Sequence, residues 1–151
     1  MRLDEAYDAI VDAIVAKLEL AKEPGGLLEG TESIVRGDRA RPRPPTPALW
    51  VFAETATPEH SPTTIQERWQ LPVVLAAIFK TDDPELGYKE ASRMAARARS
   101  VILKDRTLGL RPVVQDTRTS RYEPSGPWHN EGQLYGAVAV LQVTFRIKEG
   151  D

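Results

Sequence analysis

Two histidines and one acidic pair are the first residues to consider for metal binding or proton transfer. His60 and His129 both fall in proline-rich segments, far apart in the chain, and neither belongs to a pattern such as HExxH. Asp82 and Asp83 directly precede Pro84 and a helical pattern, so capping of that helix explains them better than a divalent ion does. We therefore predict no metal site.

The sequence offers no assembled nucleophile or phosphate cradle. Gly25-Gly26 lacks the lysine and the spacing of a phosphate-binding loop, and no strand leads into a GxGxxG element. Ser125 lies in PSGPW rather than at a strand-to-helix turn with flanking glycines. The chain has no cysteine, which excludes thiolate catalysis and disulfides and suits a reducing cytoplasm. We predict that the protein is not an enzyme and has no cofactor.

Three arginines set among prolines form the clearest binding pattern. Arg39, Arg41 and Arg43 lie in a proline-rich run whose stiff, extended backbone can hold cations against phosphate or an acidic protein. We favour a loop that orders within an assembly of subunits, or a protein contact, over nucleic acid. A second basic group on a predicted helix, comprising Arg93, Arg97 and Arg99, is interpreted as ordinary charged surface because Glu90 and other acids lie nearby.

One aromatic residue falls in a polar segment between two predicted strands. Trp128 either folds back onto the core or is buried by a partner, and the sequence leaves both alternatives open.

The elements that carry these residues follow from hydrophobic periodicity. Apolar residues at three- and four-residue steps predict an amphipathic helix from Leu3 to about Ala21, which Pro24-Gly25-Gly26 ends. A short strand at 33–36 and a proline-rich loop follow. Residues 48–53 and about 64–79 then predict a long β-hairpin, in which Pro72 suggests a bulge or a sheet edge.

The second half of the chain predicts a second helix and two further strands, without an internal repeat. A helix opens at Asp82-Asp83-Pro84 with a buried stripe that includes Ala91, Met94 and Ala98. Strands at about 112–122 and 133–148 follow, the second with strong alternation. This order predicts a single α+β domain over residues 1–151, with a mainly antiparallel sheet of about four to five strands packed against two helices.

Composition limits the partners. The 151 residues are 41% hydrophobic and 28% charged, which is an ordinary globular mix. The 20 basic and 22 acidic side chains nearly cancel, so the chain as a whole has no electrostatic reason to coat nucleic acid or a membrane. The first twenty residues alternate charged and apolar groups, which predicts neither a signal peptide nor a membrane span.

Several segments together resemble the tail-terminator and tail-completion proteins of long-tailed bacteriophages. The resemblance spans nearly the whole chain and depends on the order of segments rather than on a catalytic motif. The segments are the N-terminal amphipathic helix, IVRGD, PALWVFAE, ERWQLPVVLAAIF, DPELGYKEASRMAARARSVIL, KDRTLGL and GAVAVLQVTFRI.

The resemblance implies an α+β subunit that forms a ring, typically a hexamer, on the last ring of the tail tube. Such a ring stops polymerisation and offers a surface to the head-tail connector or stopper protein. The implied location is the virion, at the tail or the head-tail interface, after assembly in the host cytoplasm. The implied partners are further copies of the chain, the tail tube protein, the connector and, transiently, DNA passing through the lumen.

Two groups of residues are candidates for these contacts. The loop with Arg39, Arg41 and Arg43 is expected at the lumen or against a neighbouring subunit. The polar strand ends are expected to contact an adjacent ring, through Glu67, Arg68, Arg121, Tyr122, Trp128 and His129. A head-side joining subunit and a nucleic-acid-binding module remain the alternatives.

Overall fold

The computed structural model describes residues 1–37, 44–59, 66–126 and 130–148. His60, Trp128, His129 and the arginines at 39, 41 and 43 lie outside these ranges. In chain order the elements are α1 (Leu3–Ala21), β1 (Ser33–Arg36), β2 (Ala48–Ala53), β3 (Thr57–Pro58), β4 (Gln66–Lys80), α2 (Pro84–Leu103), β5 (Val114–Glu123), β6 (Asn130–Glu131) and β7 (Leu134–Lys148).

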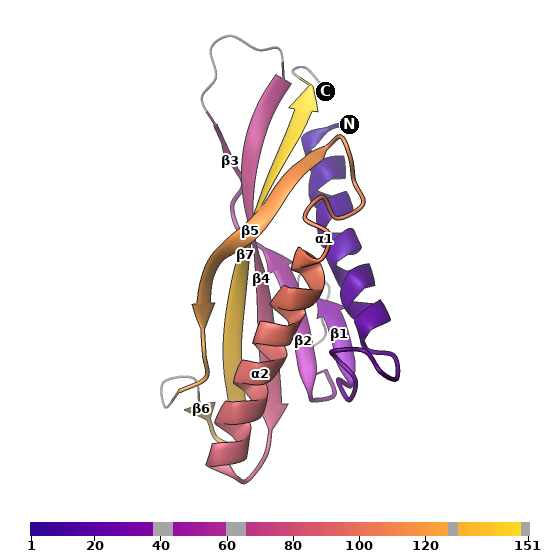
Figure 1. The fold of residues 1–151 in the computed structure, drawn as a ribbon. Helices are drawn as coiled ribbons and strands as arrows, with labels where there is room; N and C mark the ends of the chain where they lie inside the picture. The colour runs from indigo at the N-terminus through magenta and orange to yellow at the C-terminus, as the bar shows by residue number, and fades with distance from the viewer. Residues whose placement is uncertain (38–43, 60–65, 127–129, 149–151) are drawn as a thin grey trace.

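The strands form one twisted sheet in the order β1-β2-β4-β7-β5, with the two-residue strands β3 and β6 added beside β4 and β7. The parallel pair is β1 with β2, and the other neighbours run antiparallel. Strands β4 and β7 are 15 residues each and pair along their whole length, forming the long axis of the molecule (Figure 1). The predicted α+β class, with two helices on a mainly antiparallel sheet, is confirmed.

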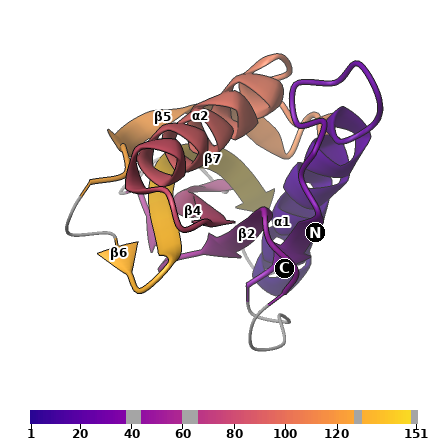
Figure 2. The ribbon, with the colours of Figure 1, turned by 90° about the horizontal axis from the view of Figure 1, so that it is seen from below.

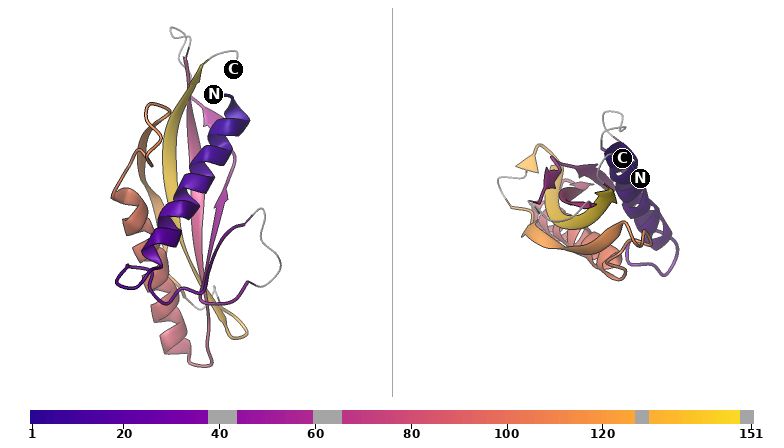
Figure 3. Two further views of the ribbon diagram at one scale, coloured as in Figure 1. Left: turned by 90° about the vertical axis from the view of Figure 1, so that its right-hand side faces the viewer. Right: turned by 90° about the horizontal axis from the view of Figure 1, so that it is seen from above.

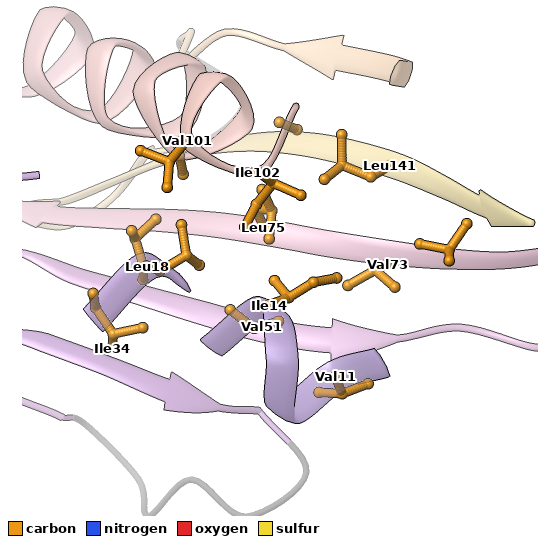
Figure 4. Packing of buried hydrophobic residues seen from close by; sticks show 14 of the residues in the cluster. Val11, Ile14, Leu18, Ile34, Val51, Val73, Leu75, Val101, Ile102 and Leu141 are labelled. Atoms are coloured by element: carbon orange, nitrogen blue, oxygen red, sulfur yellow. The ribbon is translucent and has the colours of Figure 1, made fainter. Parts of the chain in front are cut away.

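Both helices pack against the same face of the sheet. Alternate residues of β4 and β7 point to this face, and they form one core cluster with the buried stripes of α1 and α2. Figure 4 shows side chains from both helices and from the sheet, including Ile14, Ile102 and Leu75, in this core. Seen from below, α1 and α2 occupy separate positions around the twisted sheet (Figure 2).

The start of α2 is built as predicted from sequence. The Asp83 carboxylate accepts hydrogen bonds from the backbone N–H groups of Glu85 and Leu86, at 3.1 and 3.4 Å, and Pro84 opens the helix. Asp82 instead accepts a hydrogen bond from the Gln133 side chain. Neither helix in the described part of the chain has the length and apolarity needed to cross a membrane.

Pro72 does not cause the predicted bulge or edge. It lies in β4, a central strand, and the register with β7 is continuous through the pair Pro72 and Gln142. The carbonyl of Pro72 accepts from Glu54 N at 2.8 Å, just past the last residue of β2. The backbone N and O of one strand residue point toward the same neighbouring strand. The Pro72 nitrogen, which carries no hydrogen, therefore faces the gap between β2 and β3, where no ladder hydrogen bond is lost.

A buried arginine attaches α1 to the sheet. Arg36, at the end of β1, is 7% exposed, and its guanidinium lies 3.1 Å from both Asp8 and Asp12 of α1. It also lies 5.9 Å from the centre of the Tyr7 ring. The two carboxylates remain more than half exposed, at 54% and 55%. The buried cation therefore joins two exposed acids to an edge strand that is only four residues long.

We expect Arg36→Ala to lower the free energy of unfolding by about 1.5–3 kcal/mol, the range for hydrogen bonds to charged groups. The matched control is Arg118→Ala, which removes an exposed cation that forms no ion pair within the described part of the chain and should change stability by less than about 0.5 kcal/mol. Denaturant unfolding followed by circular dichroism measures both. Equal effects of the two substitutions would contradict the proposed attachment.

Close contact between Gly87 and Tyr135 predicts an unusual effect of a helical alanine. A Cβ at Gly87 would lie 2.3 Å from the Tyr135 ring, and Tyr88 packs edge-on to the same ring at 5.0 Å. Glycine to alanine in a helix normally stabilises by about 1 kcal/mol. Here we expect Gly87→Ala to destabilise by about 1–3 kcal/mol through overpacking.

The control for this substitution is Ser100→Ala, at an exposed position of the same helix, which should be neutral or slightly stabilising. Removing the ring in the double variant Gly87→Ala/Tyr135→Ala should make the alanine at position 87 favourable again. A stabilising effect of Gly87→Ala in the otherwise unchanged chain would show that the contact does not constrain α2.

Candidate interaction surfaces

The face of the sheet opposite the helices, here called the open face, is apolar. No described helix covers it. It is formed by the residues of β2, β4 and β7 that alternate with the core residues, and among them Ala48, Val74 and Val140 are buried although they do not belong to the helix-side core. The half-buried members are Trp50, Phe52, Pro72, Ala76, Ile78, Leu134 and Val138. None of these residues is among the large hydrophobic side chains that are exposed in the described chain, so the face is apolar but partly sheltered.

A pocket of about 510 Å³ lies at one end of the open face. Its walls include Trp50, Ile78 and Leu134, together with Pro44 and Pro45. The Trp50 indole N–H is buried and finds no acceptor among the described residues. Lys80 is the one ionisable side chain in the described lining, so the pocket presents apolar surface rather than an acid-base pair.

The helix side has a smaller pocket of about 160 Å³, between α2 and the segment that follows α1. Arg93 and Arg97 line it together with Glu29 and Leu27. Arg99 is on another side of α2, where its Nε donates to the Thr119 hydroxyl of β5 at 2.6 Å. The three helix arginines singled out from sequence therefore do not form one group.

The residues predicted to contact an adjacent ring, as far as the structure describes them, lie at two separate places. Glu67 and Arg68 pair with Ile147 and Arg146 near the end of β7, whereas Arg121 and Tyr122 pair with Val140 and Ala139. These positions are seven residues apart on β7, or about 24 Å. The Tyr122 hydroxyl also donates to the Ser92 carbonyl of α2 at 2.9 Å, so this side chain is directed to the helix of its own subunit.

Charge is distributed unevenly between the two sides of the fold. Residues 1–37, which hold α1 and β1, contain eight acidic and four basic side chains, whereas residues 84–123, which hold α2 and β5, contain five acidic and nine basic ones. Strands β1 and β5 are opposite edges of the sheet. The near-neutral net charge of the chain is therefore the sum of an acidic side and a basic side. The net charge of the whole chain did not predict this division.

The contact between the two helices is polar at one end. Lys17 of α1 lies 3.5 Å from Asp105, which follows α2. Hydrogen bonds from the Thr107 hydroxyl and backbone N–H to Asp105, at 2.8 and 3.1 Å, lower the pKa of this carboxyl, and Lys17 adds to the effect. Asp105 therefore acts as a turn acceptor and ion-pair partner. Within the described residues, no three potential ligands gather closely enough to hold a metal ion.

Comparison with known proteins bears on the fold. No protein-family model matches the sequence, and no curated protein matches it. The structure is similar to a chain in the solved virion of a native gene transfer agent particle, with a TM-score of 0.64 and 13% sequence identity. The similarity covers 91% of this chain and 95% of that chain. At this identity the likeness establishes a shared fold.

Proposed function

We propose that this protein is a structural subunit of a phage-like virion, where it forms a homo-oligomeric ring that caps the tail tube. The observation that carries the proposal is the nearly end-to-end similarity, over 91% and 95% of the two chains, to a chain of a virion particle. The order of segments that resembles tail-terminator proteins gives the narrower assignment. Fold similarity alone does not define a function, so the proposal depends on both.

The surfaces of the subunit suit a ring. Ring formation needs two different faces that meet head to tail, and closure depends on the rotation between them. This subunit has opposite sheet edges at β1 and β5, which carry opposite charge, and an apolar open face. Such asymmetry favours contacts between unlike faces over a self-complementary dimer.

The proposed ring is a hexamer that binds the tail tube protein on one side and the head-tail connector or stopper on the other. Its work is done by contacts, without turnover or cofactor. DNA entering the tail would pass through the lumen, where any contact is transient. The corresponding location is the virion, at the head-tail interface.

Electron microscopy of the purified protein, alone and mixed with tail tubes, tests this proposal. We expect six-fold particles at tube ends and tubes that no longer lengthen. Protein that remains monomeric at all concentrations and ignores both tubes and capsids would overturn it. Order-of-addition experiments with purified tubes and heads separate tail capping from the alternative of a head-side joining subunit.

The arginine-proline loop gives a second test. We expect the triple variant Arg39→Ala/Arg41→Ala/Arg43→Ala to reduce tail capping or head joining, because these cations are proposed to face the lumen or a neighbouring subunit. We expect the melting temperature not to change, since arginine is almost never fully buried unless it is paired, and a hydrophobic core does not depend on it. Normal joining by a folded triple variant would remove this role.

The same variant distinguishes a nucleic-acid-binding module from a structural ring. Binding to phosphate releases counterions, so affinity for DNA would fall steeply with salt. We expect the unmodified protein to show no such salt-dependent binding to duplex DNA in solution. Tight, salt-sensitive binding that the triple variant loses would favour the nucleic-acid alternative.

A further inference from the structure

Four cations form a stripe along the exposed side of α2, here called the basic stripe. Lys89, Arg93, Arg97 and Lys104 are spaced i, i+4, i+8 and i+15, which at 3.6 residues per turn places them within a sector of about 80°. All four are exposed. Arg93 lies 3.5 Å from Glu90, and the other three have no hydrogen bond or ion pair in the part of the chain that the structure describes.

Such a stripe is unfavourable in an isolated subunit. Like charges at i and i+4 destabilise a helix by a few tenths of a kcal/mol, as the pairs 89/93 and 93/97 do here. Glu29 lines the small pocket beside Arg93 and Arg97, but no ion pair joins it to them in the described residues. An acidic surface brought by another molecule would remove this repulsion.

Helix α1 carries the matching acids. Asp4, Asp8, Asp12 and Glu19, here called the acidic stripe, have the same i, i+4, i+8 and i+15 spacing. Their side chains are 73%, 54%, 55% and 46% exposed. Cations within the subunit pair with each of them: Arg36 with Asp8 and Asp12, Arg2 at 3.5 Å from Asp4, and Lys22 at 3.8 Å from Glu19. Asp8 and Asp12 have further interactions besides Arg36, and all four side chains still keep about half of their surface or more in solvent.

The acidic stripe turns away from α2 of its own subunit. Arg36 of the edge strand β1 contacts Asp8 and Asp12, which places the stripe on the flank of α1 nearest β1. Lys17 lies on the opposite flank of α1 and contacts Asp105 beyond α2. Figure 3 shows α1 along the outer side of the molecule. The two stripes therefore cannot neutralise each other within one subunit, whereas two copies can bring them together.

We propose that neighbouring copies meet through these helices, the acidic stripe of α1 in one subunit facing the basic stripe of α2 in the next. This inference depends on the proposed ring function, for which it names the heterologous contact. Helices α1 and α2 run in opposite directions in the subunit (Figure 1), and the rotation between neighbours in a six-fold ring cannot make them parallel. The alignment is therefore antiparallel, which brings Asp4 to Lys104, Asp12 to Arg97 and Glu19 to Lys89. The paired length is about 22 Å.

The contact should be selective and salt-sensitive rather than strong by itself. Exposed ion pairs contribute little each, but complementary charge sets the register and speeds encounter. Raising the salt from about 0.1 to 1 M shortens the screening length from about 10 to 3 Å and should weaken assembly.

Charge reversal tests the pairing. The acid variant is Asp4→Lys/Glu19→Lys and the base variant is Lys89→Glu/Lys104→Glu; both spare Asp8 and Asp12, which hold Arg36. Each alone should require about tenfold more protein to assemble, because like charges then face each other. An equal mixture should restore rings, since every contact between alternating copies again joins opposite charges. The control, Arg111→Glu/Arg118→Glu, changes the net charge as the base variant does, but outside the stripe, and should assemble normally.

Assembly is measured by light scattering and electron microscopy, alone and at tail-tube ends, with circular dichroism to show that each variant is folded. If the unmodified protein forms no rings in either setting, the ring function itself fails. If it forms rings and both variants do so equally, or the mixture is not rescued, the helix pairing is overturned while the ring function stands. Rings from the base variant with lost salt-sensitive DNA binding would instead assign the basic stripe to nucleic acid, which also overturns the pairing.

Discussion

The structure depends on burying one face of a long two-stranded ladder. Strands β4 and β7 pair over 15 residues, and α1 and α2 cover their core-facing side chains, such as Leu75 and Leu141. Both helices lie on the same side, so the helix-side face becomes a dry core and the open face stays without a helix in the described chain. Strands β2, β4 and β7 keep apolar residues there too, and those that the structure describes are buried or half-buried.

Surface charge also differs between the two sides of the fold. The exposed sides of the two helices carry opposite charges, with acids on α1 toward β1 and cations along α2. Arg36 is fixed beneath two acids and so attaches α1 to a short edge strand, yet it leaves their outer sides in solvent. A subunit with unlike flanks and an apolar sheet face is suited to repeated head-to-tail contact, which is the kind of contact that closes into a ring.

Much of the fold could be predicted from sequence because the periodicities were strong. The three- and four-residue steps from Leu3 predicted α1 with its observed bounds, and the alternation around Leu141 predicted β7. The bulge or edge predicted at Pro72 was wrong because a missing N–H disrupts a strand only where a neighbouring strand would accept its hydrogen bond. On the side that the Pro72 nitrogen faces, β2 ends just before that point. The candidate contact residues were less predictable: the strand ends around Arg68 and Tyr122 were grouped by polarity, but pairing with β7 holds them about 24 Å apart.

The sequence by itself determined which residues share a face of each helix or strand, where most elements begin and end, and the α+β class. These properties are local, since they depend on backbone geometry and on the near-neighbour repeat of apolar side chains. Only the tertiary structure decided the strand order, which face of the sheet stays open, and which acids of α1 surround Arg36. Those outcomes depend on contacts between residues distant in the chain, and periodicity carries no information about which element packs against a given face.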